Sequence, residues 1–74
     1  MIPFYFLPTI HMNMTYYIYK DRQGDWRWQL QAGNSKIIAD SGEGYRNKED
    51  CLHGIGLVKQ SAGAPVYEKQ VALR

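Results

Sequence analysis

Hydrophobic and polar residues alternate most regularly between positions 26 and 32. Trp26, Trp28, Leu30 and Ala32 are each separated by one polar residue. A period of two is typical of a strand with one face buried. Residues 26–32 are therefore predicted to form a strand.

Two further strands are predicted, one on each side of this segment in the sequence. Residues 16–20 are aromatic and β-branched, which favours a strand, and residues 36–41 contain a second apolar run. Residues 21–25 and 33–35 have the composition of tight turns. Strands joined by turns this short are expected to pair as an antiparallel meander.

Spacings of three and four residues between apolar positions predict a helix after residue 47. Asn47 is a suitable N-cap, and Glu49 and Asp50 lie in the first turn, where carboxylates meet the positive end of the helix dipole. Gly63 and Pro65 end the helix. One apolar stripe is predicted along it, formed by Cys51, Leu52, Ile55, Val58 and Ala62.

Residues 66–71 are predicted to form a short final strand, so the expected order is β-β-β-α-β, an α+β fold with the meander packed on one helix. Gly54 and Gly56 each weaken a helix by about 1 kcal/mol relative to alanine. We therefore expect at least one of them to allow a close approach of the helix to the sheet. The strand and the helix are expected to meet through Trp28, Leu30, Leu52, Ile55 and Val58.

The first thirteen residues show neither the two-residue period of a strand nor the three- and four-residue spacing of a helix. They are predicted to be a loosely held N-terminal extension, followed by one domain at 14–74. No run approaches the roughly 18 apolar residues of a membrane span, and the start lacks the positive region of a signal peptide. We expect a cytoplasmic protein that does not enter a membrane. Its net charge of +2 is spread along the chain, which argues against strong attraction to nucleic acid or anionic lipid.

The small size of the chain predicts self-association. A domain of 74 residues buries only roughly 60% of the surface of its unfolded chain. One cysteine excludes an intrachain disulfide, and together with two histidines it is too few for a four-ligand zinc site, so neither metal nor cofactor is expected. Residues 66–71 would be a lone strand in need of a sheet edge, and exchange of this strand in a homodimer satisfies both copies by two-fold symmetry.

No catalytic constellation is recognised in the sequence. Cys51 is the only candidate thiol nucleophile, and His53 is its near basic neighbour. Residues two apart on a helix point roughly 200° away from each other, so these two side chains are not expected to share a proton or a metal. The carboxylates are explained by turns and by the helix dipole, and no enzyme is predicted.

One face of the sheet is a candidate surface for a partner. Aromatic rings interleaved with a basic residue bind single-stranded nucleic acids by stacking and by phosphate contacts. Aromatic pairs also stabilise a sheet without any ligand, and this second interpretation is favoured. The residues expected on the face opposite the helix are Tyr17, Tyr19, Arg27, Gln29 and Gln31.

Two strings of residues carry a family resemblance: KDRQGDWRWQL at 20–30 and IIADSGEGY at 37–45. Together with Asn47-Lys48, Gly54-Ile55 and Val58-Lys59, they resemble the YegP-like family, short bacterial and archaeal domains also described as domain of unknown function 1508. The similarity covers about residues 15–71. Gly33-Asn34-Ser35 departs from it, since the family commonly has an Asn-Gly turn at this place.

The resemblance implies a β3-α-β unit that occurs as a tandem repeat or as two identical chains. In both forms the units make one continuous sheet and exchange their C-terminal strands, and the single copy in this chain favours the two-chain form. The resemblance implies no reaction and no cofactor.

We therefore expect a small non-enzymatic dimeric module that presents a sheet face to an unidentified partner. Two alternatives stay open. One is binding of RNA or single-stranded DNA through Tyr17, Tyr19 and Arg27, and the other is an enzyme whose site forms only across the dimer.

Overall fold

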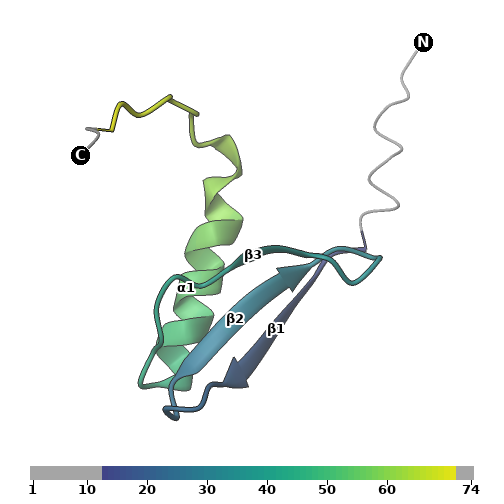
Figure 1. The fold of residues 1–74 in the computed structure, drawn as a ribbon, viewed down its shortest axis with the longest axis vertical. Coiled ribbons are helices and arrows are strands. Elements are labelled where there is room, and N and C mark those ends of the chain that lie inside the picture. Colours follow the sequence, from purple (N-terminus) through teal and green to yellow (C-terminus); the bar gives the residue numbers. More distant parts are fainter. Residues whose placement is uncertain (1–12, 72–74) are drawn as a thin grey trace.

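The computed structural model describes residues 13–71, which form a three-stranded sheet and one α-helix. The strands are antiparallel and follow the order β1-β2-β3, so that β2 lies in the middle. The helix lies across one face of the sheet (Figure 1). The elements are β1 (Thr15–Lys20), β2 (Trp26–Gln31), β3 (Ile37–Asp40), α1 (Lys48–Gln60) and the 3-10 turn η2 (Ser61–Gly63).

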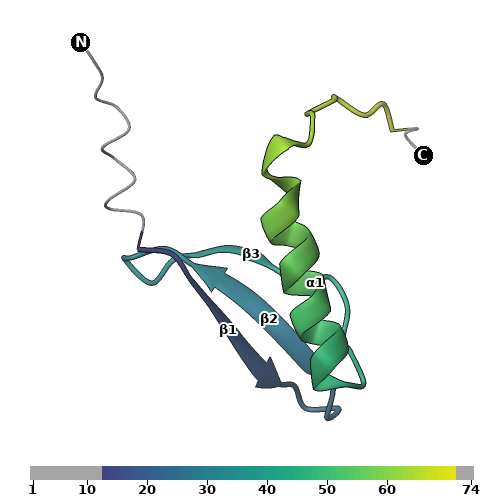
Figure 2. The same ribbon diagram turned by 180° about the vertical axis from the view of Figure 1, so that it is seen from behind.

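This arrangement confirms the predicted α+β fold and its antiparallel meander. From behind, α1 lies in front of the strands, and no described element covers the opposite face of the sheet (Figures 1 and 2). The predicted N-terminal extension, residues 1–13, lies outside the described residues except for Asn13.

Residues 64–71 do not form the predicted fourth strand within the single chain. They leave the end of α1 and run away from the sheet (Figure 1, yellow), and every one of them is exposed. Val66 is 95% exposed. A strand needs a neighbour to pair with its N–H and C=O groups, and no described segment of the same chain supplies one.

The core is centred on the middle strand and the inner side of the helix. Trp28, Cys51 and Ile55 are its buried apolar residues in the described part of the chain. The ring of Tyr16 meets that of Trp28 edge to face, with the centroids 5.7 Å apart. Around this centre pack the partly buried residues Tyr16, Ile18, Trp26, Leu30, Ala39, Tyr45 and Val58.

The helix stripe differs from the prediction at Leu52, which is 48% exposed. Successive helix residues are turned by about 100°, so Cys51, Ile55 and Val58 fall within an arc of about 60°. Leu52 is turned about 100° from Cys51 and leaves that arc. Only one of these two adjacent apolar residues can face the sheet, and the sequence pattern did not distinguish them. Ala62, the last predicted member of the stripe, is exposed in η2.

The close approach of helix and sheet occurs at Gly54. A Cβ atom placed there would lie 2.7 Å from Oη of Tyr45 and 3.6 Å from Nε1 of Trp28, whereas one at Gly56 would meet no atom within 4 Å. The Nε1 atom of Trp28 is buried without a hydrogen-bond partner among the described residues. The helix backbone therefore lies directly against the indole, and only one of the two glycines is needed for this packing.

Both hairpins are closed by turns with the same hydrogen bonds. In the first, the N–H of Gly24 donates to the carbonyl of Asp21, and the N–H of Asp21 donates to the carbonyl of Asp25. In the second, the N–H of Ser35 donates to the carbonyl of Ala32, whose own N–H donates to Lys36. The residue in the fourth position has a left-handed backbone in both turns.

This shared geometry suits Gly24 and strains Ser35. Their φ angles are 85° and 69°, and only glycine adopts such values without a steric cost from Cβ. The departure from the Asn-Gly turn of the resembling family therefore carries a local conformational strain.

We predict that Ser35→Gly stabilises the fold by about 0.5–1 kcal/mol, because the relief of the left-handed strain exceeds the entropy that glycine gains in the unfolded chain. The reciprocal change, Gly24→Ser, should destabilise it by a similar amount. Urea unfolding of both variants would measure the two effects. Changes of the same sign would contradict the equivalence of the two turns.

A second pair of variants tests the packing of the helix. Gly56→Ala should stabilise the fold by about 1 kcal/mol, because the new methyl group meets open space and alanine favours a helix. Gly54→Ala should instead destabilise it by about 1–3 kcal/mol, since Tyr45 must move to admit the methyl group. Thermal unfolding compares the two, and a stabilised Gly54→Ala variant would contradict the close approach.

Candidate functional site

The register of β1 and β2 places the five candidate residues on one face of the sheet. Tyr17 lies opposite Gln29, and Tyr19 lies opposite Arg27. Gln31 lies opposite Thr15 in the same ladder. Since side chains directly opposite each other share a face, and since Trp28 faces the helix, these residues point to the open side of the sheet.

This open face combines exposed rings with amides. Tyr17 is 51% exposed and Tyr19 is 38% exposed, although each has an apolar ring. The side-chain amide of Gln31 donates a hydrogen bond to the side-chain oxygen of Gln29 over 3.3 Å. The face therefore offers aromatic surface for contact and polar groups for orientation.

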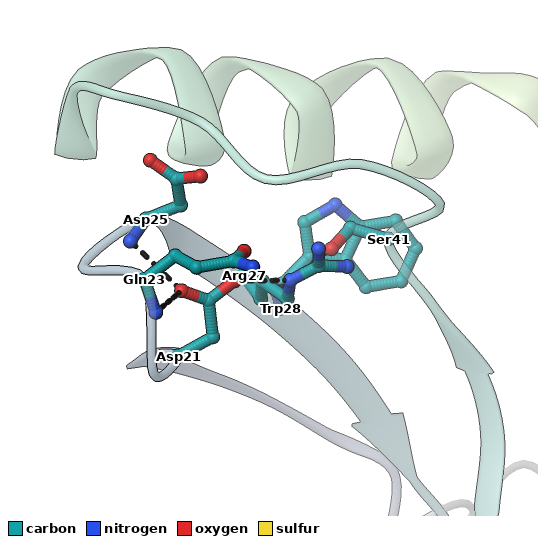
Figure 3. Close-up of polar contacts among 6 residues, drawn as sticks. All are labelled: Asp21, Gln23, Asp25, Arg27, Trp28 and Ser41. Atoms are coloured by element: carbon teal, nitrogen blue, oxygen red, sulfur yellow. Dashed lines mark hydrogen bonds and ion pairs between the residues drawn. The ribbon is translucent and has the colours of Figure 1, made fainter.

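The basic residue of the face, Arg27, is held by a carboxylate of the first hairpin turn. Its Nε donates to Oδ2 of Asp21 over 2.7 Å. The other oxygen, Oδ1, accepts the backbone N–H groups of Gln23 and Asp25, each over 2.9 Å (Figure 3). One aspartate thus closes the turn and orients the arginine.

These contacts move the pKa values of both groups apart. The hydrogen bond from Arg27, followed by that from the backbone of Asp25, lowers the pKa of Asp21 from its ordinary value. The hydrogen bond to Asp21 raises the pKa of Arg27. Both groups are therefore charged at neutral pH. The stabilisation by the pair is present above the ordinary pKa of an aspartate and is lost as the pH falls through the lowered value.

The ion pair changes what Arg27 can offer to a ligand. Its side chain is 32% exposed, but its charge is already matched by Asp21 at 2.7 Å. A phosphate group would have to compete with this carboxylate. The geometry of the face therefore favours contact through the tyrosine rings over recognition of a phosphate backbone.

Hydrogen bonds from residues that follow β3 also fix β2, the middle strand that carries part of this face. The N–H of Trp28 meets Oγ of the buried Ser41 over 3.3 Å (Figure 3), and the N–H of Ser41 donates to the carbonyl of Trp28 over 3.0 Å. Tyr45 then pairs with Trp26 through two backbone hydrogen bonds. The pairing beyond β3 fixes the strand that carries Arg27 and Gln29.

The candidate thiol, that of Cys51, is not placed for catalysis. Cys51 is completely buried in the core, and burial raises the pKa of its thiol. His53 lies on the exposed side of the same helix. Residues 13–71 contain no group of three metal-ligating side chains and form no pocket. A site formed across two copies of the chain stays a prediction.

Within the described part of the chain, no helix has both the length and the apolar character needed to span a membrane.

Sequence reasoning missed a second group of side chains, on the helix side of the sheet. Lys20 and Lys48 each place Nζ 5.4 Å from the ring centroid of Trp26. Lys59 places Nζ 5.6 Å from that of Tyr16. The available signal was the spacing of Lys48 and Lys59, since residues eleven apart lie on the same side of a helix.

Comparison with other proteins links this chain to UPF0339 proteins of bacteria and archaea. A UPF0339 protein of Neisseria meningitidis serogroup B is 48% identical over 56 residues, which cover 74% of this chain and 98% of that protein. A UPF0339 protein encoded in the 5′ region of the ptx operon of Stutzerimonas stutzeri is 43% identical over 51 residues. These residues cover 69% of this chain and 45% of that protein.

A solved structure supports the same assignment. The solution structure of a protein from Haloferax volcanii matches with a TM-score of 0.70 and 33% identity, covering 77% of this chain and 95% of the other. The family model described as Domain of unknown function (DUF1508) matches residues 21–68. The family predicted from the sequence is thus confirmed: the chain belongs to the DUF1508 family and is similar to the UPF0339 proteins of Neisseria and Stutzerimonas.

Proposed function

We propose that this protein is a non-enzymatic binding module that acts as a homodimer with exchanged C-terminal strands. In this proposal the open sheet face, with Tyr17 and Tyr19 at its centre, contacts a protein partner. The exposed C-terminal segment, residues 64–71, is the observation that carries the proposal.

The composition of this segment suits a strand better than a solvated tail. Val66 is 95%, Tyr67 85% and Val71 71% exposed, although valine and tyrosine both favour strands and valine is usually buried. The backbone is already extended at Ala64, with φ −66° and ψ 138°. Pairing with a second copy would cover these side chains and satisfy the backbone groups of the segment.

The sheet offers edges on which such a strand can pair. Both β1 and β3 have a neighbour on one side only within the described residues. Ile37 and Ile38 are each 53% exposed on β3, whose one charged residue, Asp40, lies at its end. Proteins usually shield a free edge with charges or cover it, so an apolar edge strand supports pairing with another chain.

The lengths of the relatives agree with a two-unit assembly. The Neisseria protein is matched over 98% of its length, whereas the Stutzerimonas protein is matched over only 45%. The second protein has room for another unit of the matched size. A fold that functions as a pair would occur both as one unit per chain and as two units in tandem.

The ion pair of Arg27 guides the choice between a protein partner and a nucleic acid. A protein surface can use the rings of Tyr17 and Tyr19 without any need for a free positive charge, since tyrosine is enriched at protein interfaces. Binding of single-stranded nucleic acid depends on phosphate contacts, and the charge of Arg27 is engaged by Asp21. We therefore favour the protein partner.

We expect light scattering to give about twice the mass of one chain at micromolar concentration. Removal of residues 65–74 should abolish both the dimer and cooperative unfolding, because the exchanged strands complete the sheet. A stable monomer that unfolds cooperatively, from the full chain or from the truncated one, would exclude strand exchange.

A matched set of point variants separates strand pairing from loss of side chains. Proline lacks the N–H group that a strand donates, so either Glu68→Pro or Lys69→Pro should weaken the dimer strongly. Two adjacent positions are needed because successive N–H groups point to opposite edges. Glu68→Ala and Lys69→Ala remove the same side chains and should leave the dimer intact.

The sheet face has its own test, which does not depend on the dimer. Tyr17→Ala should change stability by less than about 1 kcal/mol, because Tyr17 is half exposed, but it should abolish capture of the partner from a native lysate. Tyr16→Ala removes the ring packed on Trp28 and should destabilise the fold by about 3–5 kcal/mol. Capture by the Tyr17→Ala variant at the wild-type level would exclude this face.

A further inference from the structure

Three lysines from separate parts of the chain lie along one flank of the molecule. Lys20 ends β1, Lys48 begins α1 and Lys59 lies in the last turn of the helix. The ammonium groups of Lys20 and Lys48 both lie 5.4 Å from the ring centroid of Trp26, and that of Lys59 lies 5.6 Å from the centroid of Tyr16. We call these three lysines and two rings the basic-aromatic flank.

The positions of these residues make the flank elongated. Lys48 and Lys59 are eleven residues apart, so they lie on the same side of α1 and about 16 Å apart along its axis. Lys20 lies directly opposite Trp26 in the β1–β2 ladder and adds a second charge beside Lys48. Positive charge is therefore present at both ends of the flank.

An exposed leucine occupies the space between the two ends. Leu52 lies four residues after Lys48 on the same side of the helix and is 48% exposed. The sequence pattern predicted this residue in the core, but the helix rotation leaves it on the surface. The flank thus has an apolar centre between two basic ends.

The charges of the flank are not matched by carboxylates. Among residues 13–71 the one ion pair joins Asp21 and Arg27, on the opposite face of the sheet. Lys20, Lys48 and Lys59 are all exposed. Lys48 also lies at the start of a helix, where a positive charge opposes the dipole and where helices favour an acid. These ammonium groups are available to an anionic ligand.

We propose that the basic-aromatic flank binds an acidic peptide segment with apolar residues at its centre and carboxylates on both sides. The carboxylates would meet the lysines at the two ends, and an apolar side chain would cover Leu52. A nucleic acid fits less well, because base stacking needs free ring faces. The rings of Trp26 and Tyr16 are partly buried and have ammonium groups over them.

This site is separate from the proposed dimer and from the tyrosine face. It uses the outer flank of α1 and the helix side of β1 and β2, whereas Tyr17 and Tyr19 lie on the other side of the sheet. The contacts of the flank all lie within one chain, so they do not depend on whether two copies exchange strands.

The test is a titration of the full chain into a fluorescein-labelled peptide with Leu-Val-Leu between pairs of glutamates, followed by anisotropy at low salt. We expect saturable binding, which Lys48→Glu weakens about ten-fold because an attractive contact becomes repulsive. Lys36→Glu makes the same change in net charge in the second hairpin turn and should weaken binding less than about two-fold. An acid in the first helical turn favours the helix, so Lys48→Glu should remain folded by circular dichroism.

A second pair of variants tests the apolar centre. Leu52→Ser should weaken binding about five-fold, whereas Leu57→Ser, at an equally exposed leucine on the other flank of the helix, should have no effect. Absence of peptide binding would overturn the proposal, as would equal effects of Lys48→Glu and Lys36→Glu. It would also be overturned if an oligothymidylate of equal charge displaced the peptide and bound more tightly, since the flank would then be a nucleic-acid site.

Discussion

The packing of Trp28 against α1 determines how the other parts of the structure are placed. The indole lies at the centre of the middle strand and is 6% exposed, and the helix backbone can reach it because position 54 is a glycine. Burial of so large a ring supplies much of the apolar area of a small core. It also leaves Nε1 without a hydrogen-bond partner among the described residues, which costs about 1–3 kcal/mol. Tyr45, in the loop before the helix, also packs at position 54, and the pairing of its backbone with Trp26 keeps it there.

A core built around one indole has room for few other side chains. Within residues 13–71, the buried apolar partners of Trp28 are Cys51 and Ile55, and several large apolar residues remain on the surface. The helix packs on one face of the sheet, so the edges of β1 and β3 stay unpaired within the described residues, and the C-terminal segment stays exposed. The same limit on size that makes the fold simple therefore supports completion of the sheet by a second copy.

The alternation of side chains divides the aromatic residues between two surfaces with different electrostatics. Tyr16 and Trp26 lie on the helix side, where lysines place their ammonium groups over the rings. Tyr17 and Tyr19 lie on the open side, where the one arginine is matched by Asp21. The flank of the helix therefore carries three ammonium groups without a carboxylate partner, whereas the open face combines aromatic surface with a neutralised arginine.

Local patterns determined most of the secondary structure, because strand alternation, turn residues and helix spacing depend on neighbours in sequence. They also determined the face shared by Tyr17 and Arg27, since the short hairpin fixed the register. Tertiary structure decided which residue of the Cys51-Leu52 pair is buried, because the rotation of a helix is set by its contact with the sheet at Gly54. It also decided that Arg27 is neutralised by Asp21 and that three lysines from separate parts of the chain lie along one flank. These outcomes depend on distances between elements, and no local period of the sequence encodes such distances.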